Sequence, residues 1–540
     1  MNPLFLVIPI SLPLLGGLVM LVKPINHMMT RRIWCEAVAC LTSVCVWIAL
    51  VQVRHEPVTV YSFTRGFSVN FCVDGMATLF ALMVSVMWPL VLLYAFEYMR
   101  GDENRNRFFA FYLMTYGITL GVCFASDMIT MYLFFEMLTL VTIPLVVHYE
   151  SHESMYAGRK YAAYTIGGAS LGLMAVVLTT ISGQAGEFLY GGSISGSYDP
   201  RMMQLAFVLA FFGFGAKAAI FPLHDWLPVA SVAPTPVTAL LHAVAVVNSG
   251  VFAVLRMTYF VFGTDFLRGT PAQAVCVAAA TFSLLFGAVQ AIRERHFKRR
   301  LAYSTMSNLS YMLLGAMAMT PLGLAAALAH MLFHGIVKIV LFMCAGAFMH
   351  QAHKSYIYEI NGVGKKMPVT FATYTLCAMS LTGIPLFCGF VSKWQLLTAC
   401  SQSAAAFAKE AAAGAAGAAA SGAVGAAASG AVGTAVGAAG GIAGAARLTA
   451  LLPVILKWLL YAGDAALIAS AFMCAMYTLT ISVRAFFTTE DKDLYRDSKV
   501  SEAGILILIP ICFFCVLNIL FGVVPGPLLS FLNAIGRGIM

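Results

Sequence analysis

Residues 211–228 read FFGFGAKAAIFPLHDWLP, an apolar run with one lysine, Lys217, among Gly213, Gly215 and Pro222. Such a run predicts a helix that crosses a bilayer and is interrupted near its lysine. Gly and Pro are tolerated there because neighbouring helices and water satisfy the freed backbone groups.

Residues 380–397, SLTGIPLFCGFVSKWQLL, repeat this arrangement, with Gly383, Pro385 and Gly389 ahead of Lys393. Paired Gly/Pro-broken helices in two halves of a chain are typical of transporters built from inverted repeats, whose binding sites lie at the breaks. The alternative is an ordinary pair of helix kinks. A lysine beside each break favours a functional interpretation, because a charge at mid-bilayer is costly.

The composition extends this interpretation to the whole chain of 540 residues, of which 61% are hydrophobic and 10% charged. Those values predict an all-α polytopic membrane protein. We predict fourteen spans, near 3–22, 33–53, 76–98, 108–125, 128–148, 161–182, 203–222, 234–259, 272–292, 301–319, 322–349, 368–399, 461–484 and 503–524, followed by a short amphipathic tail.

The basic residues support this count. With the N-terminus outside, loops on the cytoplasmic side hold twenty Lys and Arg and the opposite loops hold seven, a bias that one missed span would remove. We therefore expect both termini on the non-cytoplasmic side, with the first span retained. The Ala/Gly-rich stretch 403–446 is interpreted as a flexible or partly helical external insert, because a fifteenth span would move the basic loop 484–499 to the wrong side.

Glu136 lies within MYLFFEMLTLVTIPLVV, residues 131–147. A lone carboxylate buried among Phe and Leu favours its neutral form, and a nearby cation restores its charge. We expect Lys217 to be that partner, which makes the pair a candidate switch. The alternative is a purely structural ion pair.

The stretch HMLFHGIVKIVLF, residues 330–342, places His330, His334 and Lys338 four residues apart on one helix face. A ladder of titratable groups suits proton hopping through water. A zinc site is the rival, but the span offers no third ligand and the lysine repels a cation. Satisfied core histidines are the remaining alternative.

Further candidates lie close to these spans. His242 and Asn248 are expected to be stepping points for the proton, and Lys393 the last basic station. His224 and Asp225 are candidates for proton uptake or release, with helix capping as the alternative, and Asp464 and Arg484 are weaker candidates.

Cofactor motifs are missing from the sequence. It has no P-loop, because Glu359 stands at the first glycine position of the only similar run, and no dinucleotide-binding glycine motif. The thirteen cysteines are scattered, and the pair Cys512 and Cys515 has no second pair to complete a metal site. We expect no bound cofactor or metal, and no nucleic-acid partner.

Four blocks of sequence resemble a known family, namely the runs at 216–256, 297–312, 330–348 and 383–394. They are similar to the antiporter-like membrane subunits of respiratory complex I (subunits L, M and N), of membrane-bound hydrogenases and of multisubunit cation/proton antiporters. The resemblance covers roughly residues 70–485. It implies fourteen helices with two inverted five-helix repeats and discontinuous helices seven and twelve. The implied divisions are 1–107 (three helices), 108–259 (first repeat), 260–484 (second repeat, with the insert) and 485–540 (loop, last helix and tail).

The resemblance also implies roles. Glu136, Lys217, Lys338 and Lys393 match the charged residues of a mid-membrane polar axis. Two positions depart from the pattern: Asn248 stands where several members have lysine, and His296 stands where an acid is usual.

The expected function is proton translocation as one subunit of a redox-driven complex in a bacterial or archaeal cytoplasmic membrane. The expected partners are homologous membrane subunits, a peripheral redox module and the lipid bilayer. The chain would be enzymatic only as part of an oxidoreductase complex, since it carries no redox centre of its own. The alternatives are a cation (Na⁺)/proton antiporter component driven by an ion gradient, and a scaffold whose charges merely pair.

Overall fold

The structure is a computed structural model that describes residues 3–52, 56–64, 67–183, 186–195, 197–425, 439–488, 493–495 and 498–539; side chains are described except at 183 and 414–450. It is almost wholly helical, as predicted. The helices are α1 (Leu4–Val22), α2 (Met28–Gln52), α3 (Gly75–Tyr98), α4 (Arg105–Phe124), α5 (Met128–Val146), α6 (His152–Gly183), α7 (Pro200–Gly215), α8 (Trp226–Ala230), α9 (Thr235–Ala243), α10 (Val246–Arg256), α11 (Thr264–Leu267), α12 (Pro271–Arg293), α13 (Phe297–Met317), α14 (Pro321–Ala352), α15 (Pro368–Thr382), α16 (Cys388–Gly425), α17 (Ala439–Phe486), α18 (Ile505–Val523) and α19 (Gly526–Gly536). Short helices η1 (Met257–Phe262, π), η2 (Ile357–Ile360) and η3 (Val363–Lys365) complete the helical elements.

The chain is an integral, multi-pass membrane protein. Within the described ranges, eleven helices are long and apolar enough to cross a bilayer. Helices α7 and α15 are too short on their own because each ends at a break, and α13 carries three basic residues in its first turn. The count of fourteen spans and the inverted repeats stay predictions.

Both predicted breaks are confirmed. Helix α7 ends at Gly215 and α8 starts at Trp226, and α15 ends at Thr382 while α16 starts at Cys388. A third break was not predicted: the span expected at 234–259 is divided between α9 and α10.

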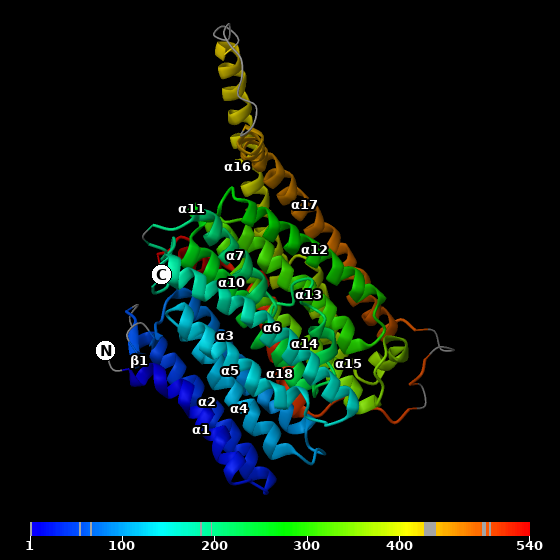
Figure 1. The fold of residues 1–540 in the computed structure, drawn as a ribbon. Helices are drawn as coiled ribbons and strands as arrows, with labels where there is room; N and C mark the ends of the chain where they lie inside the picture. The colour runs from blue at the N-terminus through cyan, green and yellow to red at the C-terminus, as the bar shows by residue number, and fades with distance from the viewer. Residues whose placement is uncertain are drawn as a thin grey trace.

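Two features lie at one end of the bundle, where the N- and C-termini also lie (Figure 1). An antiparallel hairpin, β1 (Val58–Thr64) with β2 (Phe67–Phe71), occupies a loop in which no strand was predicted. Helices α16 and α17 extend as a stalk beyond the other helices (Figure 1). The described parts of the predicted insert 403–446 are therefore helical, and 426–438 lies outside the described residues.

Helix α14 forms the centre of the core. It packs against α3, α9, α13, α15, α16, α18 and α19, and its side chains from Gly323 to Phe348 are buried. A helix that is apolar on all sides is stable only when neighbours surround it. His330, His334 and Lys338 of α14 are therefore buried inside the bundle.

Candidate functional site

The break between α7 and α8 exposes backbone groups that the surrounding protein satisfies. The indole of Trp226 donates to the carbonyl of Ala216 at 2.9 Å, and the N–H of Phe221 donates to the hydroxyl of Ser283 at 2.9 Å. Because buried backbone groups need partners, these bonds hold the interruption in one conformation.

Lys217 lies at the start of this break and is completely buried. Its ammonium donates to the carbonyl of Phe135 in α5 and lies 3.6 Å from the centroid of that residue's ring. Glu136 is the next residue of α5. The two charges interact electrostatically, yet the described residues contain no direct ion pair between them, and Oε1 of Glu136 has no hydrogen-bond partner. This arrangement keeps the carboxylate free to change partners.

Glu136 also faces sideways out of the bundle. It borders a cavity of about 410 Å³ between α5 and α6, whose other walls include Leu173, Val176 and Val177. The carboxylate can therefore be reached from the lateral surface as well as from Lys217.

Gly250 lets α10 approach the Lys217 break closely. A Cβ atom at this position would stand 2.5 Å from the backbone nitrogen of Ala218 and 2.9 Å from the carbonyl carbon of Lys217. Any side chain here must displace the break.

The unpredicted break between α9 and α10 lies beside His242 and Asn248. The amide of Asn248 donates to the carbonyl of Ala243 at 2.8 Å, so Asn248 satisfies a backbone group that the break exposes. His242 is fully buried, its ring centroid lies 4.8 Å from that of Phe342, and neither ring nitrogen has a hydrogen-bond partner.

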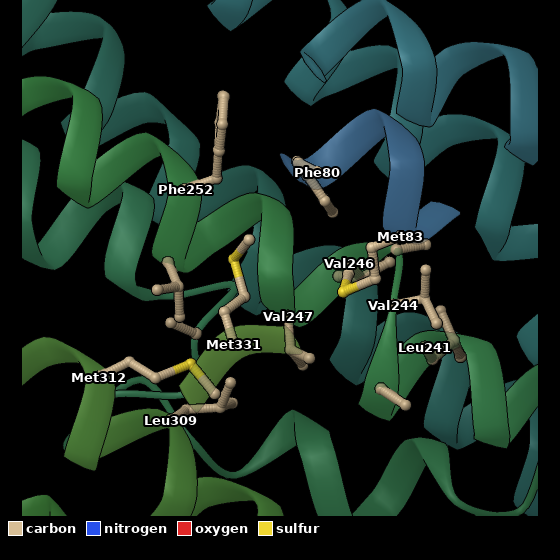
Figure 2. Packing of buried hydrophobic residues seen from close by; sticks show 14 of the residues in the cluster. Phe80, Met83, Leu241, Val244, Val246, Val247, Phe252, Leu309, Met312 and Met331 are labelled. Carbon is tan, nitrogen blue, oxygen red and sulfur yellow. The ribbon is translucent and has the colours of Figure 1, made fainter. Parts of the chain in front are cut away.

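Apolar side chains from α3, α10, α13 and α14 surround this break (Figure 2). Among them are Phe80, Val247, Met312 and Met331. Since unpartnered buried polar atoms are rare, the imidazole of His242 is a group that a water molecule or a transferred proton would satisfy.

Helix α13 supplies hydrogen-bond partners to the ladder of His330, His334 and Lys338 on α14. Lys338 is fully buried and donates to the carbonyl of Leu301 at 3.0 Å and to the hydroxyl of Ser304. No acidic side chain pairs with it in the described part of the chain. Its ammonium is held by backbone and hydroxyl dipoles, whereas Lys217 also interacts with the charge of Glu136.

The two histidines of α14 differ in their partners. His330 is hydrogen-bonded to Ser392 in α16 at 2.9 Å and to Asn308 in α13 at 3.3 Å. His334, whose ring centroid lies 6.1 Å from that of His330, has no partner on either nitrogen. Across the described ranges, no three His, Cys, Asp or Glu side chains gather where they could hold a metal ion.

Helix α13 contributes polar groups that sequence reasoning missed. Ser304, Asn308 and Tyr311 follow each other at spacings of four and three, and each contacts a ladder residue of another helix. This spacing, in a helix much less apolar than its neighbours, was the signal that could have identified them.

Lys298 lies in the first turn of the same helix. The sequence predicts it in a loop, but it is only 4% exposed and donates to the carbonyl of Ala233 at 2.9 Å. Arg300, predicted in the same loop, is buried and donates to three carbonyl groups. The loop is shorter than predicted because α13 begins at Phe297.

Lys393 occupies the second predicted break. Its ammonium donates to the carbonyls of Leu381 and Thr382, the latter at 3.4 Å, and lies 4.9 Å from the ring centroid of Tyr311. A cavity of about 140 Å³ adjoins it, lined also by Gly383 and Trp394.

The candidate uptake and release residues lie nearer the ends of the bundle. Asp225 pairs with Lys160 of α6, and the ring of His224 packs on Phe221 and Phe286. Asp464 in α17 accepts a hydrogen bond from Ser401 at 2.8 Å. None of these contacts joins a ladder residue directly.

His296, the unusual residue before α13, caps that helix. Its Nδ1 accepts from the N–H of Arg299 at 3.5 Å. Burial, together with the charges of Lys298 and Arg299, lowers the pKa of His296 to about 4. The neutral imidazole thus accepts the bond that an acidic residue would accept at an N-cap.

An ion pair that sequence reasoning also missed lies at the C-terminal end of α10. The guanidinium of Arg256 binds both carboxylate oxygens of Asp74, which caps α3 through the N–H of Ala77. Such two-point pairs fix geometry as well as charge.

Comparison with known proteins identifies the chain. The family model described as NADH:quinone oxidoreductase/Mrp antiporter, transmembrane, matches residues 125–415, and one described as the N-terminus of complex I chain 5 matches residues 62–109. The chain belongs to this family of antiporter-like membrane subunits. It is 31% identical over 376 residues to NADH-quinone oxidoreductase subunit N of Desulforudis audaxviator, covering 68% of this chain and 74% of that protein.

Other relatives come from both branches of the family. The chain is 31% identical over 353 residues to a component of the Na(+)/H(+) antiporter of Alkalihalophilus pseudofirmus, covering 62% of this chain but only 43% of that protein. It likewise spans about half the length of the subunit 5 and subunit L relatives it matches.

Solved structures share the fold over almost the whole chain. One chain of the membrane-bound sulfane sulfur reductase, an archaeal respiratory membrane complex, superposes with a TM-score of 0.78 at 22% identity, covering 99% of this chain and 97% of that one. One chain of respiratory complex I from Thermus thermophilus superposes with a TM-score of 0.73 at 20% identity, covering 99% and 100%.

Proposed function

We propose that the chain is a proton-translocating subunit of a multisubunit, redox-driven membrane complex. One observation carries the proposal: Lys217, Lys338 and Lys393 are held inside the bundle by carbonyl and hydroxyl dipoles instead of by carboxylates. A lysine without an acidic partner releases its proton readily when its surroundings change, because desolvation already disfavours the charged form.

In the proposed path, a change at Glu136 shifts the proton of Lys217, and the change continues to Lys338 through His242 and His334, whose ring nitrogens have no hydrogen-bond partner among the described residues. From there Ser304, Asn308, His330 and Ser392 form hydrogen-bonded steps toward Lys393. Lys298, buried in the first turn of α13, would receive protons from the cytoplasmic side.

The driving free energy comes from a partner. Moving one charge against the membrane potential costs about 2.3 kcal/mol per 100 mV. We propose that neighbouring homologous subunits and a peripheral redox module supply it, with Glu136 on the lateral surface receiving the signal. We further propose that the chain binds no cofactor itself, that both termini face the non-cytoplasmic side, and that the membrane is bacterial or archaeal.

A component of a Na⁺/proton antiporter is the second candidate, favoured by the identity to the antiporter protein of Alkalihalophilus pseudofirmus. Sodium, like other hard cations, requires oxygen ligands. The buried path is rich in nitrogen, which favours the proton.

Proteoliposomes containing the complete complex, with pH-sensitive and Na⁺-sensitive dyes inside, test both candidates. Lys217→Ala and Glu136→Ala should abolish proton uptake while the complex still assembles, and Lys354→Ala, at an exposed lysine, should have no effect. Unimpaired pumping in both test variants would reject the mechanism, and Na⁺ counterflow in the wild type would select the second candidate.

A further inference from the structure

A groove on α17 lies far from the ladder. Its volume is about 660 Å³. It is lined by Asn361 and by side chains between residues 475 and 488, at the C-terminal end of α17 and just beyond it. Helix α17 runs along the outside of the bundle (Figure 1), and the groove lies at its C-terminal end. This is the end at which the sequence predicts the cytoplasmic face.

The described part of the groove carries a positive charge. Arg484 lines it, and among the described residues no carboxylate or carbonyl accepts from its guanidinium. Asp493, in the loop that follows, is engaged by Lys365 at 3.2 Å. The guanidinium of Arg300 lies within electrostatic range of Arg484, and its own donors are occupied by carbonyl groups.

An apolar stripe leads to this charge. Phe472, Met476 and Val483 lie on α17 and Phe487 directly follows it, at spacings of four, seven and four, and each is exposed, Phe472 by 71% and Phe487 by 82%. Side chains at these spacings share one helix face. The stripe is as long as an acyl chain needs, and it ends beside Arg484, Asn361 and Thr488.

We propose that this groove binds an anionic phospholipid, with the phosphate at Arg484 and the acyl chains along the stripe. A guanidinium matches a phosphate through paired N–H donors, and the polar atoms of Asn361 and Thr488 complete the headgroup site. Phosphatidylglycerol and cardiolipin have the required charge, whereas phosphatidylcholine is neutral overall.

Tryptophan quenching by brominated lipids tests the site in the complete complex. Phe487→Trp places a reporter beside Arg484, and Phe472→Trp places a matched reporter on the same stripe far from the charge. Because one basic residue near a membrane surface contributes a few-fold preference for anionic lipid, brominated phosphatidylglycerol should bind at the first reporter about five-fold better than brominated phosphatidylcholine. The second reporter should show no preference.

Arg484→Gln in the Phe487→Trp background should remove the preference, and Arg484→Lys should keep part of it. Arg537→Gln, at an exposed arginine near the other end of the bundle, should leave it intact. Equal quenching by both lipids in the wild-type background, or a preference that survives Arg484→Gln, would overturn the proposal. Full displacement of the lipid by inorganic phosphate would overturn the choice of a lipid as the occupant.

Discussion

The two broken helices hold their lysines in different ways. Lys217 is bound by the carbonyl and ring of Phe135, which belong to another helix, and a carboxylate lies nearby. Lys393 binds the carbonyls of its own break, and a cavity adjoins it. The first site is therefore sealed and coupled to an acid, whereas the second is open and has none. We therefore expect Lys217 to act as the switch and Lys393 to be the site at which the proton is released.

The largest expected effect separates the two lysines directly. Lys217→Met should lower proton translocation about 100-fold, because no other group can transfer the proton at a sealed position. Lys393→Met should lower it only about 10-fold, because water in the adjoining cavity can replace the amine. Initial rates of proton uptake into proteoliposomes measure both. Equal losses would remove the distinction between the halves.

Gly250 tests whether the first break must keep its position. Gly250→Ala introduces a Cβ atom 2.5 Å from the nitrogen of Ala218, so we expect a loss of about 1–3 kcal/mol in the free energy of unfolding together with slower translocation. Thermal unfolding in detergent measures the former.

The matched control is Gly167→Ala in α6, where an added Cβ would meet no atom within 4 Å. This variant should unfold at the wild-type temperature or slightly above it. A Gly250→Ala protein with wild-type stability would mean that α10 can move away from the Lys217 break.

Asn248 extends the comparison to the break between α9 and α10, within the predicted first repeat. Asn248→Ala leaves the buried carbonyl of Ala243 unpaired and should cost about 1–3 kcal/mol in the free energy of unfolding. Ser249→Ala should cost less, because the carbonyl of Ala245 also accepts the backbone N–H of Ser249. If the two variants unfold at the same temperature, the amide of Asn248 does not hold the break.

The smallest effect concerns His296, at the start of the polar face of α13. With its pKa lowered to about 4 from an ordinary value near 6.5, the unfolded chain binds a proton between these values and the folded chain does not. Stability is therefore lost as the pH falls from about 6.5 to about 4, by about 1–3 kcal/mol.

His296→Asn keeps an N-cap acceptor and removes the titration, so its unfolding temperature should fall less than that of the wild type over this range. His353→Asn, at an exposed histidine, should leave the pH dependence unchanged. A wild-type pH profile in His296→Asn would contradict the assignment.

The local pattern of residues along the sequence was sufficient to predict much of the fold and part of the candidate site. Gly383 adopts a positive φ and Pro385 donates no hydrogen bond, so their combination in one short stretch made the second break predictable. The break at Val244 and Ala245 was not predictable, since neither residue interrupts a helix by itself. Similarly, a lysine near a cluster of arginines usually lies in a loop, and only the packing of α8 and α9 over α13 buries Lys298.

By itself, the sequence determined that this protein is a helical membrane protein with ionisable residues inside apolar spans. Both conclusions follow from short stretches of sequence, because the length of an apolar segment and the charged residues within it can be read without knowing the fold. Only the tertiary structure decided the hydrogen-bond partners: Lys217 with Phe135, Lys338 with Ser304, and His330 with Asn308 and Ser392. The physical reason is that a hydrogen bond depends on distances of about 3 Å between atoms far apart in sequence, and the way helices pack sets those distances.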